Sequence, residues 1–121
     1  MSNKLNLLIV EDNIDRINWF QKEFCDCRII FAKTAKQGIR AINSEVFSTI
    51  LLDHDLGDRV FVPSSDSNTG YQVALAIPNS INKDTPVIVH SWNPVGTFRI
   101  LNVLPNAKRQ IFGSFSRSIL K

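Results

Sequence analysis

The sequence predicts an α/β fold in which a five-stranded parallel sheet lies between two layers of helices. Three observations support this prediction. Short apolar runs alternate along the chain with longer segments whose apolar residues recur every three or four positions. The runs are continuously apolar, which is typical of strands buried on both faces. The order of predicted elements is βαβαβαβαβ, and such alternation favours a parallel sheet with helices on both sides.

Length and composition set the outer limits. The chain has 121 residues, of which 44% are apolar, so we expect one domain over residues 1–121 with a real core. The formal net charge of +3 comes from scattered basic residues, so nucleic acid is not an expected partner. The apolar stretch near the start is too short for a signal or membrane segment. We therefore expect a cytoplasmic protein with no membrane partner.

The first strand and helix follow from apolar spacing. Residues 7–10 are continuously apolar and predict the first strand. Apolar residues at near-helical spacing predict a helix over residues 14–24, with Asp12 or Asn13 as its N-cap.

The next elements repeat this pattern. Residues 28–32 predict the second strand, and Thr34 caps a helix that runs to about Ile42. Residues 47–52 are rich in β-forming side chains and predict the third strand. A polar loop then extends to about residue 70.

The second half adds two helices and two strands. A helix is predicted from about residue 71 to 77, and a fourth strand over residues 86–91. Asn93 caps another helix that ends near Leu104, with proline in its first turn. Residues 110–115 predict the last strand. Only six residues follow, so we expect the last helix to be truncated or missing.

Ionisable and polar side chains gather where three of the predicted strands end. They are Glu11, Asp12, Asp53, His54, Asp55, His90 and Ser91. Ligands of open parallel sheets bind outside the carboxyl ends of the strands. Carboxylates brought together at one edge repel each other, and a hard divalent cation removes that penalty. Glu11, Asp12, Asp53 and Asp55 are therefore candidate ligands for Mg²⁺ or Mn²⁺. The alternative is that some of these acids only cap helices.

Three segments resemble the response-regulator receiver family. They are LIVEDN at residues 8–13, ILLD at residues 50–53 and PVIVHS at residues 86–91. The resemblance covers nearly the whole chain. It implies the flavodoxin/CheY-like three-layer sandwich, a role in two-component phosphorelay signalling and a cytoplasmic location.

The resemblance also implies roles for individual residues. In receivers the acidic pair after the first strand holds Mg²⁺, and here that pair is Glu11 and Asp12. The aspartate that ends the third strand is the phosphoacceptor, a role that falls on Asp53. A Thr or Ser that ends the fourth strand contacts the phosphoryl group, which implicates Ser91.

Two features depart from the receiver pattern. Receivers place a Lys at the end of the fifth strand, but residues 112–116 read FGSFS. Lys108 and Arg109 precede the predicted strand, at its wrong end, and Arg117 lies beyond it. The missing final helix is the second departure. Both weigh against an ordinary phosphorylation switch.

Three further segments resemble a divergent group, the cyclic-phosphate-processing receiver-like domains. They are DHDL at residues 53–56, TGY at residues 69–71 and HSWNPVG at residues 90–96. The resemblance implies a cyclic phosphate or phosphoester as the small-molecule partner.

Both histidines of the chain lie at the predicted functional edge. Beside Asp53, either His54 or His90 is an acid–base candidate for a cyclic phosphate. Adjacent strand residues point to opposite faces, so both histidines point away if Asp53 and Ser91 face the pocket. A structural role for each histidine therefore stays open.

Other residues near this edge are candidates for holding the phosphate. Ser91 and Asn93 are candidates for hydrogen bonds to its oxygens, and Gly70 allows close approach of the backbone to a ligand. Trp92 offers a surface for a nucleobase or an output partner, or simply packs.

Three functions remain open at this stage. The first, which we favour, is a metal-dependent domain that binds a cyclic phosphate or acts on it as a cyclic phosphodiesterase. The second is a receiver phosphorylated on Asp53 that signals to a protein partner. The third is a pseudo-receiver, a binding module without phosphoryl chemistry.

Overall fold

The computed structural model describes residues 4–57 and 59–113, and it has the predicted five-stranded parallel sheet. The strands are β1 (Asn6–Val10), β2 (Arg28–Ala32), β3 (Thr49–Leu52), β4 (Val87–Val89) and β5 (Lys108–Arg109). Their order across the sheet is β2-β1-β3-β4-β5, with every pair parallel. The chain order reverses beside β1, so β1 and β3 are neighbours at the centre of the sheet.

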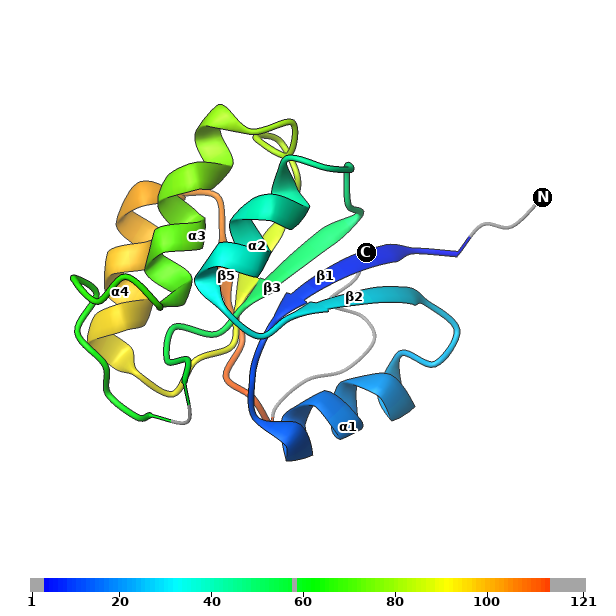
Figure 1. Cartoon of the computed structure of the whole chain (residues 1–121), viewed down its shortest axis with the longest axis horizontal. Coiled ribbons are helices and arrows are strands. Elements are labelled where there is room, and N and C mark those ends of the chain that lie inside the picture. The colour runs from blue at the N-terminus through cyan, green and yellow to red at the C-terminus, as the bar shows by residue number, and fades with distance from the viewer. Residues whose placement is uncertain (1–3, 58, 114–121) are drawn as a thin grey trace.

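Helices cover both faces of the sheet (Figure 1). They are α1 (Ile14–Glu23), α2 (Ala35–Ile42), α3 (Gly70–Ala76) and α4 (Pro94–Val103), with a 3-10 turn at Ile77–Asn79. Figure 1 shows α1 on one face and the other three on the opposite face. The predicted three-layer sandwich is confirmed, and most element bounds differ from the predicted ones by one or two residues.

Two buried clusters fill the layers on either side of the sheet. Strand residues alternate between them because successive side chains point to opposite faces. On β1, Leu7 and Ile9 pack toward Phe20 of α1, whereas Leu8 and Val10 pack toward α2 and α3. This double burial explains why the strands are continuously apolar in sequence.

The predicted N-caps fix where three helices begin. Asn13 Oδ1 accepts from the Arg16 N–H at 3.1 Å, and Thr34 Oγ1 accepts from the Gln37 N–H at the same distance. Asn93 Oδ1 accepts from the Gly96 N–H at 2.9 Å. Each cap follows the end of a strand directly or closely, so the caps also set the direction in which the chain leaves the functional edge.

The prediction for the last strand was wrong, because the observed strand begins two residues earlier and ends before residue 110. β5 is Lys108–Arg109, the pair expected to precede the strand. Both residues are exposed at the edge of the sheet, so no apolar run marks them. The ladder continues weakly beyond them, since the Phe112 N–H donates to the His90 carbonyl at 3.2 Å. Residues 114 and 115 of the predicted segment, Arg117 and the expected missing helix lie outside the described residues.

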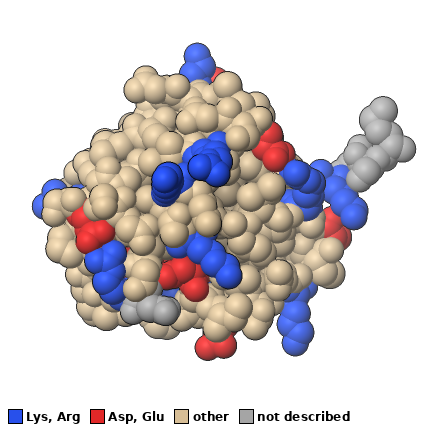
Figure 2. Space-filling model, in the orientation of Figure 1, with Lys and Arg blue, Asp and Glu red and all other residues tan. Residues whose placement is uncertain are grey.

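Charge is dispersed over the face of the molecule that Figure 2 shows. The face in Figure 2 shows basic and acidic side chains interspersed among other residues, in line with the scattered charge of the sequence. Within residues 4–57 and 59–113, no helix has the length and apolar character needed to cross a membrane.

Candidate metal and phosphate site

The carboxyl ends of the three central strands bring Glu11, Asp53 and His90 together. Register decides this grouping. Leu52 pairs with both Val10 and Val89, so the residues that follow these three lie side by side. Glu11, Asp53 and His90 continue the parity of the residues that face α1, and their side chains therefore point to the α1 side of the sheet.

These three side chains are close enough to share an ion. Ligand atoms of Glu11, Asp53 and His90 all lie within 4.8 Å of one another. Glu11 and His90 are fully buried, and Asp53 is 5% exposed. The sequence grouped Asp53 with Ser91, whereas the fold groups it with His90.

Glu11 is the most constrained member of the group. Its Oε2 accepts from the N–H groups of Asp12 and Asn13, each at 3.1 Å. Its Oε1 lies 2.9 Å from His90 Nε2 and 3.4 Å from Arg16 Nη1. Burial acts to raise the pKa of Glu11, but these partners outweigh it and hold the pKa below its ordinary value.

An ionised Glu11 determines the state of His90. A carboxylate only accepts hydrogen bonds, so His90 Nε2 carries the hydrogen that it shares with Glu11. Burial lowers the pKa of His90 despite the hydrogen bond to Glu11, which keeps the ring neutral. The ring packs edge-on against Phe20 with centroids 5.3 Å apart. Its position suits orienting the carboxylate of Glu11.

Asp53 is the acid of the site whose ionised form is least favoured. Burial raises its pKa well above the ordinary value, and the charge of Glu11 and a hydrogen bond with it add to the rise. Arg16 opposes the rise, with Nη1 3.6 Å from Asp53 Oδ2. A second positive charge, such as a divalent ion, would relieve the remaining repulsion.

Arg16 is a site residue that sequence reasoning missed. Its guanidinium lies 4.6 Å from the ring centroid of Trp92 and 4.8 Å from that of Phe112. It contacts both buried acids from the first turn of α1. It therefore places a cation beside both acids and beside Phe112, which follows the last strand. The one sequence signal for such a residue was the absence of the expected lysine from residues 112–116, since nothing in the spacing of α1 marks Arg16.

A cavity of ≈ 250 Å³ opens above this group. The four predicted metal ligands line it, namely Glu11, Asp12, Asp53 and Asp55, together with Arg16 and Arg59. Arg59, also missed from the sequence, holds Asp66 with two hydrogen bonds of 2.8 and 3.2 Å. Trp92 also lines the cavity, whereas the remaining predicted site residues do not, namely His54, Gly70, His90, Ser91 and Asn93.

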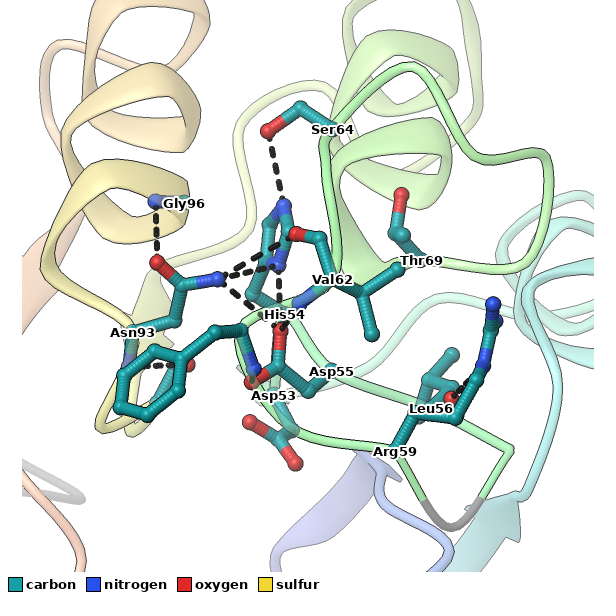
Figure 3. A network of polar contacts seen from close by, with 12 residues as sticks. Asp53, His54, Asp55, Leu56, Arg59, Val62, Ser64, Thr69, Asn93 and Gly96 are labelled. Carbon is teal, nitrogen blue, oxygen red and sulfur yellow. Dashed lines mark hydrogen bonds and ion pairs between the residues drawn. The ribbon is translucent and has the colours of Figure 1, made fainter.

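Asp55 and His54 belong to a second polar network (Figure 3). Asp55 Oδ1 lies 2.8 Å from His54 Nδ1, and His54 Nε2 lies 2.8 Å from the Ser64 hydroxyl. Asn93 Nδ2 donates to Asp55 Oδ1 at 3.0 Å. Figure 3 shows the His54 ring directed away from the Asp53 carboxylate, toward Ser64. Both ring nitrogens are thus engaged in joining the long loop to α4.

Two predicted phosphate contacts have partners within the protein. The Ser91 side chain is buried, and its Oγ accepts from the Asn93 N–H at 3.0 Å. Asn93 caps α4 and contacts Asp55.

The two glycines of this region allow close packing. A Cβ on Gly96 would lie 2.4 Å from the His54 ring, and one on Gly70 would lie 1.9 Å from the Asp53 carbonyl oxygen. The close approach that Gly70 permits in this structure is therefore to the backbone of Asp53.

Comparison with known proteins identifies the family. The model of the family described as "Cyclic-phosphate processing Receiver domain" matches residues 7–106. The chain belongs to this family. The resemblance read from the three motif segments is confirmed. Curated proteins gave no match to this receiver domain.

Solved structures place the domain within the wider receiver fold. A CheY-like receiver from Methanospirillum hungatei is 20% identical, with a TM-score of 0.71, covering 98% of this chain and 89% of that one. The receiver of the sensor histidine kinase PA1611 from Pseudomonas aeruginosa, with magnesium in its active-site cleft, is also 20% identical, with a TM-score of 0.71 and coverages of 97% and 91%. A Burkholderia pseudomallei response regulator with a phosphorylated aspartate, calcium and citrate is 16% identical, with a TM-score of 0.73 and coverages of 97% and 65%.

Proposed function

We propose that this receiver domain binds a divalent cation, Mg²⁺ or Mn²⁺, together with a phosphate ester, and that cyclic phosphates are its substrates. One observation carries the proposal. Two buried carboxylates, Glu11 and Asp53, have ligand atoms within 4.8 Å at the floor of an open cavity, where burial and then the charge of Glu11 raise the pKa of Asp53. The family description and the magnesium in the cleft of the PA1611 receiver support the same chemistry.

The donor set fits a hard cation. Mg²⁺ takes one or two carboxylates and keeps several waters, which matches buried acids beneath a water-accessible cavity. Asp53 and Asp12 would hold the ion. Glu11 would add its negative charge beside them, because both of its oxygens already accept hydrogen bonds within the protein. When bound, the ion would polarise a phosphoryl oxygen.

The chain's own residues would do the rest. Arg16 would attract the phosphate to the cavity and offset its charge. His90 would keep Glu11 oriented through the 2.9 Å hydrogen bond. Asp55, His54 and Asn93 would fix the loop that forms the far wall of the cavity. Neither histidine lines the cavity, so in this proposal both act as positioning residues.

A metal titration tests the proposal. Calorimetry with Mg²⁺ or Mn²⁺ should show binding that Asp53→Asn weakens by about tenfold or more. Asp84→Asn is a matched control, because Asp84 is exposed and does not line the cavity. Equal affinities in all three proteins would reject the metal site.

A substrate panel tests the second part. The protein is incubated with Mn²⁺ and a set of 3′,5′- and 2′,3′-cyclic phosphates, and binding and product are measured by NMR. We expect at least one member to bind in a manner that requires both the metal and Asp53. Lack of binding and of turnover across the panel would reject the cyclic-phosphate function.

A phosphoacceptor role on Asp53 is the second candidate. It is favoured by the position of Asp53 directly after β3, beside the cation of Arg16. Treatment with acetyl phosphate and Mg²⁺, followed by intact-mass spectrometry, tests it. An adduct that Asp53→Asn abolishes would support a signalling receiver with a protein partner. Its absence under conditions that phosphorylate a control receiver would reject this role.

A further inference from the structure

Large apolar side chains are exposed at the rim of the same cavity. Val60 is 78% exposed, Phe61 is 68% exposed and Trp92 is 59% exposed, and all three line the cavity. Val60 and Phe61 come from the long loop after β3, and Trp92 follows β4. Two aromatic rings thus stand at the mouth of a site whose floor is acidic. Exposed apolar groups gathered at one pocket mark a binding surface.

Trp92 is held rigidly in its exposed position. Its Nε1–H donates to the Phe112 carbonyl at 3.0 Å, which fixes the edge of the indole. The Arg16 guanidinium lies over the ring, 4.6 Å from its centroid. A ring fixed in this way offers contact area without a further loss of side-chain freedom on binding.

Phe61 is held in an unfavourable backbone conformation. Its φ is 52°, in the left-handed region that bulky residues rarely adopt. Asp55 maintains it, since its Oδ2 accepts from the Phe61 N–H at 2.7 Å and its Oδ1 accepts from the Val62 N–H at 3.1 Å. Burial of the ring does not explain the conformation, because the ring is exposed. Such strain gathers at ligand-binding sites.

The cavity is too small to enclose a whole nucleotide, so only part of such a ligand would lie inside it. Its ≈ 250 Å³ is below the roughly 300–1,000 Å³ of pockets that enclose a whole small ligand. The charged floor suits a phosphate and an ion, so the rest of the ester must lie at the mouth. There it would meet Phe61 and Trp92.

We propose that the aromatic rim binds the nucleobase of a nucleotide whose phosphate occupies the cavity. This inference rests on the proposed function and narrows its substrate class to cyclic nucleotides rather than base-free cyclic phosphates. Every nucleobase has a flat π-face, and stacking on an aromatic side chain strengthens binding by about 5- to 150-fold per base. Phe61 and Trp92 are the specificity-determining residues in this arrangement.

Two esters of equal charge test the rim. In saturating Mg²⁺, the affinity for adenosine 2′,3′-cyclic phosphate is compared with that for glycerol 1,2-cyclic phosphate, which lacks a base. We expect the adenosine ester to bind about 5- to 150-fold more tightly. Binding of the adenosine ester should also quench tryptophan fluorescence. The quenching should be lost in Trp92→Phe, which retains Trp19 as its tryptophan, and this loss would assign the effect to Trp92.

A pair of phenylalanine variants locates the effect. Phe61→Ala should reduce the preference for the adenosine ester, because it removes one of the two rings that stack on the base. Phe98→Ala is the matched control, because Phe98 is 65% exposed on α4 and does not line the cavity. It should leave the preference for the base intact.

The outcomes separate the two proposals. Equal binding of both esters by the wild-type protein overturns the aromatic rim and leaves the proposed function standing. An equal loss of preference in Phe61→Ala and Phe98→Ala also overturns the rim, because the effect would then be nonspecific. Binding of neither ester overturns this inference, and lack of binding and of turnover across the whole panel overturns the proposed function as well.

Discussion

Replacing Gly70 by Ala should destabilise the protein by separating α3 from the end of β3. The added Cβ would lie 1.9 Å from the Asp53 carbonyl oxygen and 3.2 Å from His54 Cα. Backbone must therefore move by more than 1 Å to reach even a 3.0 Å contact. That movement weakens the 2.9 Å hydrogen bond from the Gly70 N–H to the His54 carbonyl. Overpacking costs about 1–3 kcal/mol and a lost hydrogen bond about 1 kcal/mol, so we expect a loss of about 2–4 kcal/mol.

Urea unfolding followed by circular dichroism measures this loss, without metal or ligand. Gly38→Ala is the matched control in another helix, since its Cβ would meet only side-chain methyl groups, with Val73 Cγ2 at 2.9 Å and Val10 Cγ2 at 3.4 Å. Alanine also favours the helix by up to about 1 kcal/mol, so we expect a smaller loss than in Gly70→Ala. Wild-type stability in Gly70→Ala, or equal losses in both variants, would refute the packing argument.

Three further outcomes follow from contacts at and away from the site. His90→Leu should weaken Mg²⁺ binding by about 10- to 100-fold in calorimetry, because leucine has no donor to replace the hydrogen bond that orients Glu11. Arg59→Gln should raise the pKa of Asp66 from about 2 toward its ordinary value, as seen by NMR titration. Because that pKa is depressed, the stabilising contribution of the pair is present at neutral pH and is lost as the pH falls toward 2. Asn82→Ala should cost about 3 kcal/mol in urea unfolding, since this buried side chain makes three hydrogen bonds of 2.8 Å to backbone groups.

The sequence allowed most of the fold to be predicted because local and global signals agree. The continuous run at residues 7–10 reflects a strand buried on both faces. Three helix starts are visible in the sequence because each N-cap side chain bonds to a backbone N–H only three residues further on, at Asn13, Thr34 and Asn93. β5 escaped because two exposed basic residues at a sheet edge leave no apolar pattern.

Only the site residues that directly follow a strand could be predicted from the sequence. The lining acids, such as Asp12 and Asp53, were visible because each follows a strand. The grouping of Asp53 with His90 depends on strand register, which the sequence does not display. The pairing of His54 with Ser64 depends on the path of a long loop. Side chains brought in by a helix or loop carry no local signature of their partners.

In the proposed function, Arg16 would supply the cation that the receiver pattern expects from a lysine after the last strand. Residues 110–120 contain no lysine, and the Phe112 ring lies against the guanidinium there. A lysine after the last strand would reach the phosphoacceptor as a flexible point charge, whereas a planar guanidinium held between two rings has a fixed direction. Three parts of the chain hold this guanidinium in position, namely α1, Trp92 after β4 and Phe112 after β5. The cation is thus fixed in place before a ligand arrives. That arrangement suits a site that holds a small phosphate ester better than one that signals through movement of its last strand.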